Sequence, residues 1–343
     1  MLSVQVNLHT IIKNVAIIKR HLQSGTKICA VVKANAYGFG LTKISQLLAP
    51  YVDCFAVATV QEGIALRQIG IRQDILLLGI CEDISTAIKH NLIITVENLF
   101  QALSIQKNKL HPRIHIAVNT GMNRFGLNSV HELREILQIC THEQVEGIYT
   151  HFAYESDNPT ALKIALERFH KFTQICKKYF PRVLVHAGCS GAINYPAAHL
   201  DMIRIGKALY GGISETQTAL TVTSRIVAVK KIKPGATVGY NGIYTATQPT
   251  IVGIVRGGYA NGIPTQFSGT VQVLVGKQLC RIIGRVCMDY FFIDASKIVN
   301  PLSQIVTIIA PQNGQTILDI ARQAKMITCD LLQKFNSAIN ERR

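Results

Sequence analysis

The strongest constraint on the fold is an alternation of short β-rich runs with helical stretches over the first two-thirds of the chain. The runs are apolar and rich in β-branched residues, which is typical of buried parallel strands. The eight predicted strands span residues 27–32, 53–58, 74–78, 92–96, 113–119, 145–151, 182–187 and 202–205. Eight strands that alternate with helices over roughly 200 residues predict a (β/α)8 barrel of the TIM type. Because the last two connections are short, a doubly wound open sheet is the alternative.

Helical stretches lie between most of these strands, for example at residues 60–69, 129–140 and 160–178. The last of them carries apolar residues at three- and four-residue steps, which predicts one buried helix face. Its members are Leu162, Leu166, Phe169, Phe172, Ile175 and Cys176.

The pattern changes after about Gly212. Runs such as "LTVTSRIVAVKKI" and "TVQVLVGKQLCRIIG" are β-branched and are broken by Pro-Gly, Gly-Gly and Gly-Lys turns, and little helix is expected before residues 316–334. This texture predicts a mostly antiparallel β domain over residues 213–343, after a barrel over residues 1–212. The alternating run at residues 3–8 is expected to add a strand to either domain.

The composition favours a folded protein of the cytoplasm. Hydrophobic residues make up 48% of the chain and charged residues 16%, which argues against disorder. The longest apolar runs are too short to span a bilayer, and the N-terminus does not resemble a signal peptide. The nine cysteines are scattered without CxxC pairs or zinc-like spacing, so we expect reduced thiols, no metal site and no membrane partner.

The formal net charge of +16 raises the possibility of nucleic-acid binding. The basic residues are dispersed, however, and the densest cluster is the single short stretch at residues 230–233. No nucleic-acid-binding motif accompanies it. The alternative explanation of the net positive charge is an electrostatic field that attracts a small anionic molecule. We expect no nucleic acid as a partner.

Polar residues recur where several of the predicted barrel strands end. The carboxyl ends of barrel strands form the active-site face, so these side chains are expected at one rim. They are Lys33, Asn119 with Arg124, His151, His186 with Ser190, and Arg204 with Gly206. Each alone has a structural explanation: a lysine that extends to solvent, a core histidine, an arginine of an ion pair. Their co-location favours a site.

The same residues suggest a cofactor. Backbone N–H groups at Gly206, in "RIGKALYGG", are suited to a phosphate, whereas the Walker A and GxGxxG motifs of nucleotide sites are absent. Pyridoxal 5'-phosphate requires an amine for its Schiff base, a partner for its ring nitrogen and donors for its phosphate. Lys33, an arginine on a neighbouring strand and the Gly206 loop satisfy this requirement.

Several motifs then reveal a specific resemblance. "AVVKANAYGFG", at residues 30–40, resembles the cofactor-attachment motif of bacterial alanine racemases, which are fold-type III pyridoxal-phosphate enzymes. "NTGMNRFG", "THFAYES", "RIGKALYGG", "VGYNGIYTA", "GGYANGI" and "GRVCMDYFFID" continue the match in family order. The resemblance therefore covers nearly the whole chain. It implies interconversion of L-alanine and D-alanine, which supplies D-alanine for peptidoglycan.

The resemblance also implies the roles of individual residues. Lys33 would hold the cofactor as an internal aldimine and act as the base on the D-face, and Tyr240 would be the base on the L-face. Tyr240 would reach the barrel of a second subunit, so the active form would be a head-to-tail homodimer. The resemblance further implies that Arg204 contacts the ring nitrogen and that the phosphate is bound by Tyr37, Ser190, Gly206 and Lys207. Arg124 would contact the cofactor and the substrate carboxylate, and Met288 would contact that carboxylate. His151 would lie behind Arg204 and Tyr240, Tyr259 would lie at the entrance, and Asp289 would support the site.

Some positions depart from the family pattern. Many members have a carbamylated lysine and an aspartate that brace the substrate arginine, but here these positions are Ala117 and Asn119. A bound anion such as chloride, or a network through Asn119, is expected to replace them. Asn261 replaces another usual aspartate, and Ser337 aligns with a usual phosphate-binding tyrosine. Lys207 replaces an apolar residue, and we expect its side chain to point to solvent rather than add charge at the phosphate.

Simple chemistry supports a racemase. Racemisation removes a proton from one face of Cα and returns one to the other, so two bases on opposite faces are the simplest arrangement. A guanidinium does not readily lose a proton, so it keeps the ring nitrogen unprotonated and disfavours transamination. The alternatives are a racemase of broader specificity, a related pyridoxal-phosphate decarboxylase, which would need an acidic partner for that nitrogen, and a non-catalytic cofactor-binding barrel, which would lack the second domain.

Overall fold

The structure is a computed structural model that describes residues 2–140, 144–155, 157–312 and 314–336. By its internal contacts the chain divides into two compact units. One contains Val15–Ala36 and Gly40–Ala208, and the other contains the remaining described residues, including Tyr37–Phe39.

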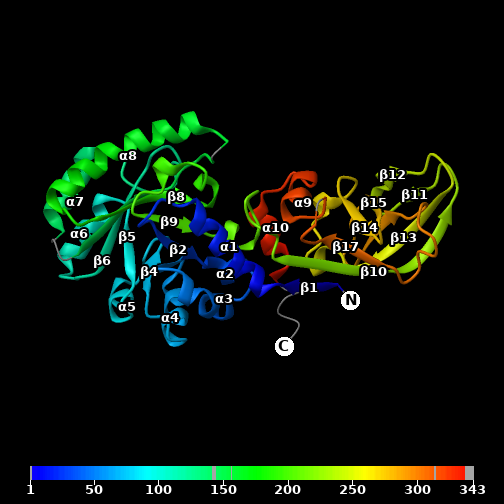
Figure 1. The fold of residues 1–343 in the computed structure, drawn as a ribbon, viewed down its shortest axis with the longest axis horizontal. Coiled ribbons are helices and arrows are strands. Elements are labelled where there is room, and N and C mark those ends of the chain that lie inside the picture. The colour runs from blue at the N-terminus through cyan, green and yellow to red at the C-terminus, as the bar shows by residue number, and fades with distance from the viewer. Residues whose placement is uncertain (1, 141–143, 156, 313, 337–343) are drawn as a thin grey trace. The chain divides into compact units, whose positions relative to one another are not determined.

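The first unit is a closed barrel of parallel strands, which confirms the predicted fold class (Figure 1). Its strands follow chain order, and β2 pairs with β9 to close the barrel, so the open-sheet alternative is wrong. The strands are β2 (Lys27–Val31), β3 (Cys54–Val57), β4 (Asp74–Leu77), β5 (Ile93–Val96), β6 (Arg113–Val118), β7 (Val145–Thr150), β8 (Leu184–Cys189) and β9 (Met202–Ile205). All residues of β3, β5 and β9 are buried, as expected for strands covered on both faces.

Helices surround the barrel strands on the outside in Figure 1. They are α1 (Leu8–His21), α2 (Lys33–Tyr37), α3 (Leu41–Leu48), α4 (Val60–Gln68), α5 (Ile84–Lys89), α6 (Leu99–Lys107), α7 (Val130–Ile139) and α8 (Pro159–Tyr179). Side chains of Thr59, Asp83, Asn98, Ser129 and Asn158 cap the helices that follow them. The predicted apolar face of α8 is buried at Leu162, Phe169, Phe172 and Cys176.

The connection between β8 and β9 has no α-helix, which explains its short length in the sequence. It contains the 3-10 turns η2 (Ser190–Ala192) and η3 (Pro196–Ala198), and η4 (Lys207–Tyr210) follows β9. These turns bring Ser190 and Gly206 close to each other at the carboxyl ends of β8 and β9.

The second unit is built on an antiparallel sheet, as predicted for the C-terminal part. Its order is β1-β10-β13-β16-β15-β14-β17, with an additional β10–β17 pairing, and β11–β12 form a separate hairpin. The strands are β1 (Ser3–Val6), β10 (Leu220–Ile232), β11 (Thr237–Val238), β12 (Tyr244–Thr245), β13 (Thr250–Arg256), β14 (Gln272–Val275), β15 (Gln278–Ile283), β16 (Tyr290–Asp294) and β17 (Ile305–Ile309). The N-terminal strand β1 thus joins the C-terminal sheet, through β10.

The helix expected at residues 316–334 is two helices, α9 (Ile317–Gln323) and α10 (Thr328–Lys334). Lys325 has a φ of 53°, a left-handed conformation that ends α9. Short 3-10 turns carry the remaining loops: η1 (Ala49–Tyr51), η5 (Tyr240–Gly242), η6 (Tyr259–Asn261) and η7 (Thr265–Phe267).

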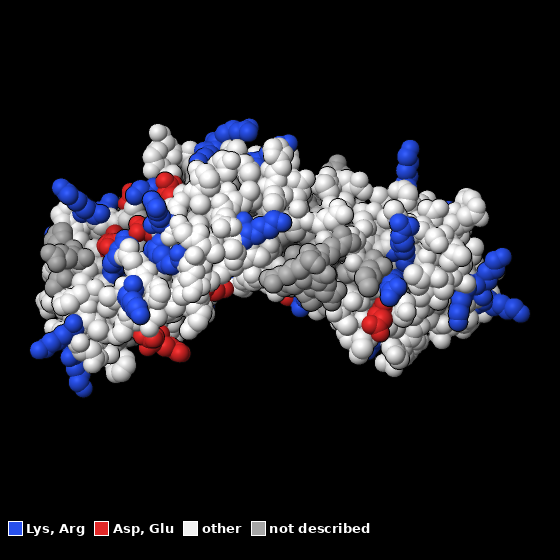
Figure 2. Space-filling model, turned by 90° about the horizontal axis from the view of Figure 1, so that it is seen from below, with Lys and Arg blue, Asp and Glu red and all other residues white. Residues whose placement is uncertain are grey.

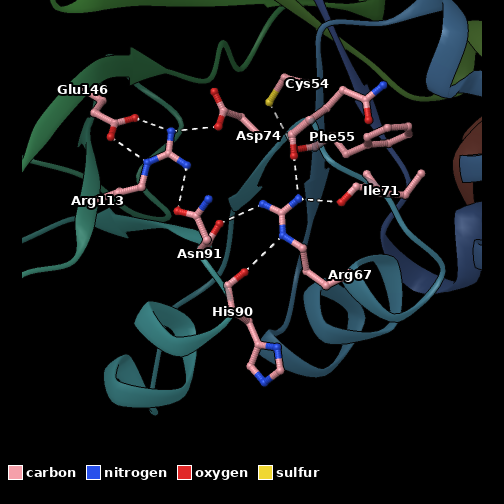
Figure 3. A network of polar contacts seen from close by, with 10 residues as sticks. Cys54, Phe55, Arg67, Ile71, Asp74, His90, Asn91, Arg113 and Glu146 are labelled. Carbon is pink, nitrogen blue, oxygen red and sulfur yellow. Dashed lines mark hydrogen bonds and ion pairs between the residues drawn. The ribbon is translucent and has the colours of Figure 1, made fainter.

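A polar network at the amino-terminal end of the barrel strands was not predicted from the sequence (Figure 3). Arg113, which begins β6, donates to both carboxylate oxygens of Glu146 at 2.6 and 2.7 Å and to Asp74 at 2.7 Å. Arg67 of α4 donates to four backbone carbonyls, of Ile71, Gln73, His90 and Asn91. This end of a barrel serves stability rather than catalysis, so the network is expected to hold the barrel closed.

Charge is dispersed over the face of the molecule that Figure 2 draws. On the face drawn in Figure 2, Lys and Arg side chains stand singly or in small groups between uncharged residues, and Asp and Glu lie among them. Within the part of the chain that the structure describes, no helix is long and apolar enough to cross a membrane.

Candidate active site

Lys33 follows β2 at the carboxyl end of the barrel, as predicted, and begins a turn of unusual backbone conformation. Ala34, Asn35, Ala36 and Tyr37 all have φ between 53° and 57°, so α2 is one left-handed turn. Left-handed backbone costs L-residues roughly 1–2 kcal/mol each, and only asparagine among these residues tolerates it well. The turn is therefore strained, and surrounding contacts must stabilise it.

Contacts within the barrel unit hold this turn at both ends. The Ala36 N–H donates to the Val32 carbonyl at 2.8 Å, and the Gly40 N–H donates to the Asn35 carbonyl at 3.0 Å. The Asn35 side chain accepts from the Leu41 N–H at 2.8 Å, where α3 begins. These bonds fix the path of the backbone on which Lys33 lies.

Arg204 lies buried near the carboxyl end of β9, with only 3% of its surface exposed. One of its terminal nitrogens donates to His186 Nδ1 at 2.7 Å, and the other donates to the carbonyls of Thr150 and Ala187. The guanidinium carbon lies 5.0 Å from the Tyr149 ring centre. Of its five N–H groups, these bonds use three, so two remain for a ligand as far as the described residues are concerned.

Two buried histidines continue this network. Because arginine can only donate, His186 Nδ1 accepts and its Nε2 carries the proton, which is donated to His115 Nδ1 at 2.9 Å. Burial is the main cause that lowers the pKa of His115 to about 3 and that of His186 well below its usual value, and the charge of Arg204 contributes to both. Arg204 is thus surrounded by neutral acceptors.

His151 follows β7 and lies within reach of three cationic groups. Its pKa is lowered to about 3, first by burial and then by the charges of Arg204, Arg124 and Lys33. A neutral imidazole is the result across the physiological range. The charges of Lys33, Arg124 and Arg204 thus all act on His151, and the grouping of these four residues as one site stays a prediction.

The loop of Arg124 is organised without the usual bracing residues. Asn119 accepts from the Gly121 and Asn123 N–H groups at 3.0 Å and donates to the side chains of Asn123 and Asn128 at 2.8 Å. Asn119 thus orders the backbone beside Arg124.

The Arg124 guanidinium itself has no hydrogen-bond acceptor among the described residues, and its contact is with the Phe125 ring at 5.8 Å. Ala117 is buried within β6. The expected network through Asn119 therefore holds the loop and does not reach the guanidinium.

Ser190 and the loop after β9 form a cluster of hydrogen-bonded groups. The Ser190 hydroxyl oxygen accepts from the Gly206 N–H at 3.0 Å and the Ala208 N–H at 3.3 Å. Since the oxygen accepts both bonds, its own proton is available to a ligand. Ser190 is 5% exposed, so an anion held here is largely shielded from water.

Lys207 does not point to solvent, and this expectation is wrong. Its ammonium group pairs with Glu155, from the loop after β7, and its side chain is only 17% exposed. The Glu155 side chain packs directly on the Cα of Gly191, where a Cβ would lie 2.4 Å from the Glu155 carboxyl carbon. An ion pair therefore lies beside the Ser190 cluster.

Tyr37 belongs to the second unit, where its ring lies 5.6 Å from that of Tyr210. Tyr210 also stacks on Phe39 at 4.2 Å, and its buried hydroxyl has no hydrogen-bond partner in the described structure. Gly38 packs against Asn336, where a Cβ would lie 3.1 Å from the asparagine Cβ. Ser337, the next residue, lies outside the described part of the chain.

Tyr240 begins η5 in the second unit and is 65% exposed. Gly239 before it has a φ of 74°, which favours glycine, and a Cβ there would lie 3.1 Å from the backbone nitrogen of Arg285. The turn of Tyr240 is therefore fixed against the loop between β15 and β16.

The same loop carries Met288 and contacts the turn of Tyr259. The Tyr259 N–H donates to the Cys287 carbonyl at 3.0 Å, the Ala260 N–H to the Met288 carbonyl at 3.1 Å, and the Gly257 N–H to the Asp289 carbonyl at 2.7 Å. The Asn261 side chain accepts from the Gly258 N–H at 3.2 Å, which stabilises this turn. Tyr240, Tyr259 and Met288 thus gather on one exposed part of the second unit.

The barrel groups fit pyridoxal 5'-phosphate. An amine ends β2, a buried guanidinium with two unused N–H groups ends β9, and the Ser190 hydroxyl, which accepts two backbone bonds and has its own proton to donate, lies beside the loop after β9. This donor set matches an aldehyde, an unprotonated ring nitrogen and a phosphate. Described His, Cys, Asp and Glu side chains form no group that could hold a metal ion.

Sequence reasoning missed several residues that support this site. They are Glu62, His115, Tyr149 and Glu155, and His186 was noted only as a residue at a strand end. Histidines near the middle of apolar strands were an available signal, since a buried polar side chain requires a partner.

Comparisons with known proteins identify the family of this chain. The family models "Alanine racemase, N-terminal domain" and "Alanine racemase, C-terminal domain" match residues 6–214 and 219–342. The curated alanine racemase of Streptococcus uberis is 35% identical over 95% of this chain and 93% of its own length. That of Ligilactobacillus salivarius is 33% identical over 95% and 94%.

Solved structures give the same result. The structure of alanine racemase from Bacillus anthracis with bound L-Ala-P has a TM-score of 0.84 and 27% identity, and the match covers 97% of this chain and 92% of that chain. The biosynthetic alanine racemase from Pseudomonas aeruginosa has a TM-score of 0.88 and 27% identity, over 97% and 96%.

Proposed function

Since the chain belongs to the alanine racemase family, we propose that Lys33 and Tyr240 are the two bases with which it interconverts L-alanine and D-alanine. The family reaction is an isomerisation that supplies D-alanine for peptidoglycan. The residues at the rim of the barrel and on the exposed part of the second unit would hold the cofactor and the substrate.

The residues at the barrel rim would hold pyridoxal 5'-phosphate. When bound through the Lys33 amine, the cofactor supplies conjugation that stabilises negative charge at the substrate Cα. Ser190 with the backbone of Gly206 and Lys207 would hold the phosphate, and Tyr37 would add a hydroxyl. Arg204 would direct an unused N–H to the ring nitrogen.

The network of Arg204 is the observation that carries the proposal. Its partners are a neutral histidine and two carbonyls, and none is a carboxylate. Nothing in that network donates a proton to a ring nitrogen, because arginine does not readily release one. Such an environment supports a proton exchange at Cα and disfavours transamination and the acid-assisted chemistry of the decarboxylase alternative.

Lys33 would hold or release the Cα proton on the D-face, and Tyr240 on the L-face. The surroundings of Tyr240 support its supply by a second copy of the chain. Ile243, Tyr259, Met288 and Tyr290 are 43–54% exposed in the same unit, and large exposed apolar groups of this kind favour an interface. We therefore propose a head-to-tail homodimer in which each active site takes residues from both chains.

The other site residues would orient the substrate. Arg124, exposed on its loop, would bind the substrate carboxylate together with the backbone of Met288. His151, kept neutral by its cationic neighbours, would accept a hydrogen bond without adding charge. Tyr259 would narrow the entrance, and Asp289 would support the loop that carries Met288. A chloride ion near Arg124 would replace the missing carboxylates.

Two further parts of the proposal concern the chain as a whole. The barrel would comprise residues 1–212 and the β domain residues 213–343, with the second base supplied by the β domain. The protein would act in the cytoplasm, where alanine and the cofactor are available.

Incubation with L-alanine in D2O tests the proposed function. The cofactor-loaded enzyme should form D-alanine that carries deuterium at Cα, measured by chiral chromatography with mass spectrometry. Tyr240→Phe should reduce L-to-D turnover by at least about 100-fold, as expected for loss of a general base. Tyr244→Phe, a nearby tyrosine in β12, is the control. Formation of no isomer by the loaded enzyme would refute the assignment.

A further inference from the structure

The left-handed turn after Lys33 is held by a side chain from a different barrel segment. Glu62, in the first turn of α4, accepts the Ala34 N–H at 2.7 Å through Oε1. Its other oxygen, Oε2, accepts the Ala58 N–H at 2.8 Å at the end of β3. One carboxylate thus connects the residue after Lys33 to the neighbouring strand end.

Glu62 is also part of an ordinary capping box. The Thr59 hydroxyl accepts the Glu62 N–H at 3.2 Å, and Glu62 Oε2 accepts the Thr59 N–H at 3.3 Å. Capping uses only one of the two carboxylate oxygens. The bond from Ala34 is therefore additional to what the helix requires.

The capping box of α7 shows this difference. Glu132 accepts the Asn128 and Ser129 N–H groups at 2.9 and 3.1 Å, both through Oε2, in the same pattern as Glu62 with Ala58 and Thr59. Every bond that the structure gives to the Glu132 carboxylate comes from residues directly before its own helix. Glu132 is thus a matched cap that does not reach the turn after Lys33.

We infer that Glu62 is a positioning residue for Lys33: its carboxylate holds the strained turn in the conformation that presents the amine to the cofactor. The inference rests on the proposed role of Lys33. The Ala34 N–H is the first donor after the lysine, so its bond fixes the backbone next to the Cα that carries the amine. A left-handed turn of non-glycine residues relaxes toward ordinary backbone unless such contacts hold it.

Removal of this bond should weaken cofactor attachment without unfolding the barrel. A hydrogen bond to a charged acceptor that is partly exposed to solvent corresponds to roughly a 5- to 30-fold change in an equilibrium. Glu62→Ala should therefore weaken cofactor affinity by this factor relative to Glu132→Ala. Both variants lose a capping carboxylate and with it the same cap contribution, and Glu62→Ala loses the Ala34 bond in addition.

The experiment uses apoenzyme prepared from the wild type and from four variants: Glu62→Ala, Glu132→Ala, Glu62→Gln and Glu132→Gln. Pyridoxal 5'-phosphate is titrated in, and Schiff-base absorbance gives the affinity. Borohydride reduction and peptide mass spectrometry then measure how fast Lys33 itself is labelled. Urea unfolding of the apoenzymes measures the cap contribution separately. The glutamine pair decides the question if Glu62→Ala does not fold, because one acceptor oxygen remains.

The outcomes separate the inference from the proposed function. Weaker affinity and slower Lys33 labelling in the Glu62 variants than in the Glu132 variants, with all apoenzymes folded under the conditions of the titration, would support the positioning role. Equal affinity and labelling in each pair would overturn it. Failure of borohydride to label Lys33 in the wild-type enzyme would instead refute the proposed function on which the inference rests.

Discussion

Acidification from pH 7 to pH 5 is expected to destabilise the barrel through its buried histidines. Burial lowers the pKa of His115 to about 3, whereas a histidine in the unfolded chain titrates near 6.5. Between these two values the unfolded chain binds a proton that the folded chain does not. The stability that the lowered pKa of His115 contributes is therefore fully present above about pH 6.5 and is lost progressively as the pH falls toward 3.

The size of the effect follows from these two pKa values. At pH 5 the unfolded state gains ~2 kcal/mol from protonation of His115 alone. His186, whose pKa is also lowered by burial and by Arg204, adds a loss in the same direction. Folded proteins are stable by only about 5–15 kcal/mol, so the loss is readily measurable.

Urea unfolding at pH 7 and pH 5, at one protein concentration, provides the assay. His115→Asn keeps an acceptor oxygen close to the position of Nδ1, so the His186 bond is preserved while the titrating ring is removed. This variant should be less stable than the wild type at pH 7 through lost packing, but it should lose about 2 kcal/mol less between the two pH values. The exposed His111, changed to Asn, controls for the substitution itself. If His115→Asn and the wild type lost equal stability between pH 7 and pH 5, the reasoning would be refuted.

Two other perturbations test separate parts of the structure. Arg67→Lys cannot bond all four backbone carbonyls that Arg67 joins, so it should lower the free energy of unfolding by about 2 kcal/mol, measured in urea. The KM for L-alanine should be unchanged. The control is the same substitution at the exposed Arg72, Arg72→Lys. Equal unfolding midpoints for the two variants would contradict this role. Lys207→Met leaves the Glu155 carboxylate without its partner beside Ser190, so it should weaken cofactor binding by about tenfold in a spectroscopic titration. Addition of Glu155→Gln should restore the affinity, and a double variant as weak as Lys207→Met would argue against the electrostatic explanation.

The sequence predicted the parts of the fold that local pattern controls. The barrel strands were placed within one or two residues because each is a short apolar run, and α8 was placed because its apolar residues recur at helical spacing. Closure of the barrel could be expected only from the number of strands, because the β2–β9 pair joins residues at opposite ends of that region. The break between α9 and α10 was missed because Lys325 carries no signal for a left-handed backbone.

The sequence predicted the position of a residue that ends a strand, but not contacts that depend on distant partners. Lys33, His151 and Arg204 lie at the carboxyl ends of β2, β7 and β9 as predicted, and their role in a site stays a prediction. The preference of Lys207 for Glu155 was missed because the partners lie 52 positions apart and meet only through two loops. The hydrogen-bonded series from Arg204 through His186 to His115 joins three strands. Histidines within apolar strands signal that each needs a buried partner, but the sequence does not say which residue that partner is.

A mixing experiment tests the central claim most directly, that Lys33 of one chain and Tyr240 of another form one active site. Lys33→Ala and Tyr240→Phe enzymes, each nearly inactive alone, are mixed in equal amounts under conditions that allow the chains to exchange, and L-alanine racemisation is measured. Random exchange into dimers should restore about a quarter of the wild-type activity, because half of the dimers are mixed and each mixed dimer has one intact site of two. Activity that stays at the level of the separate variants, although mass spectrometry shows mixed dimers, would contradict the shared site.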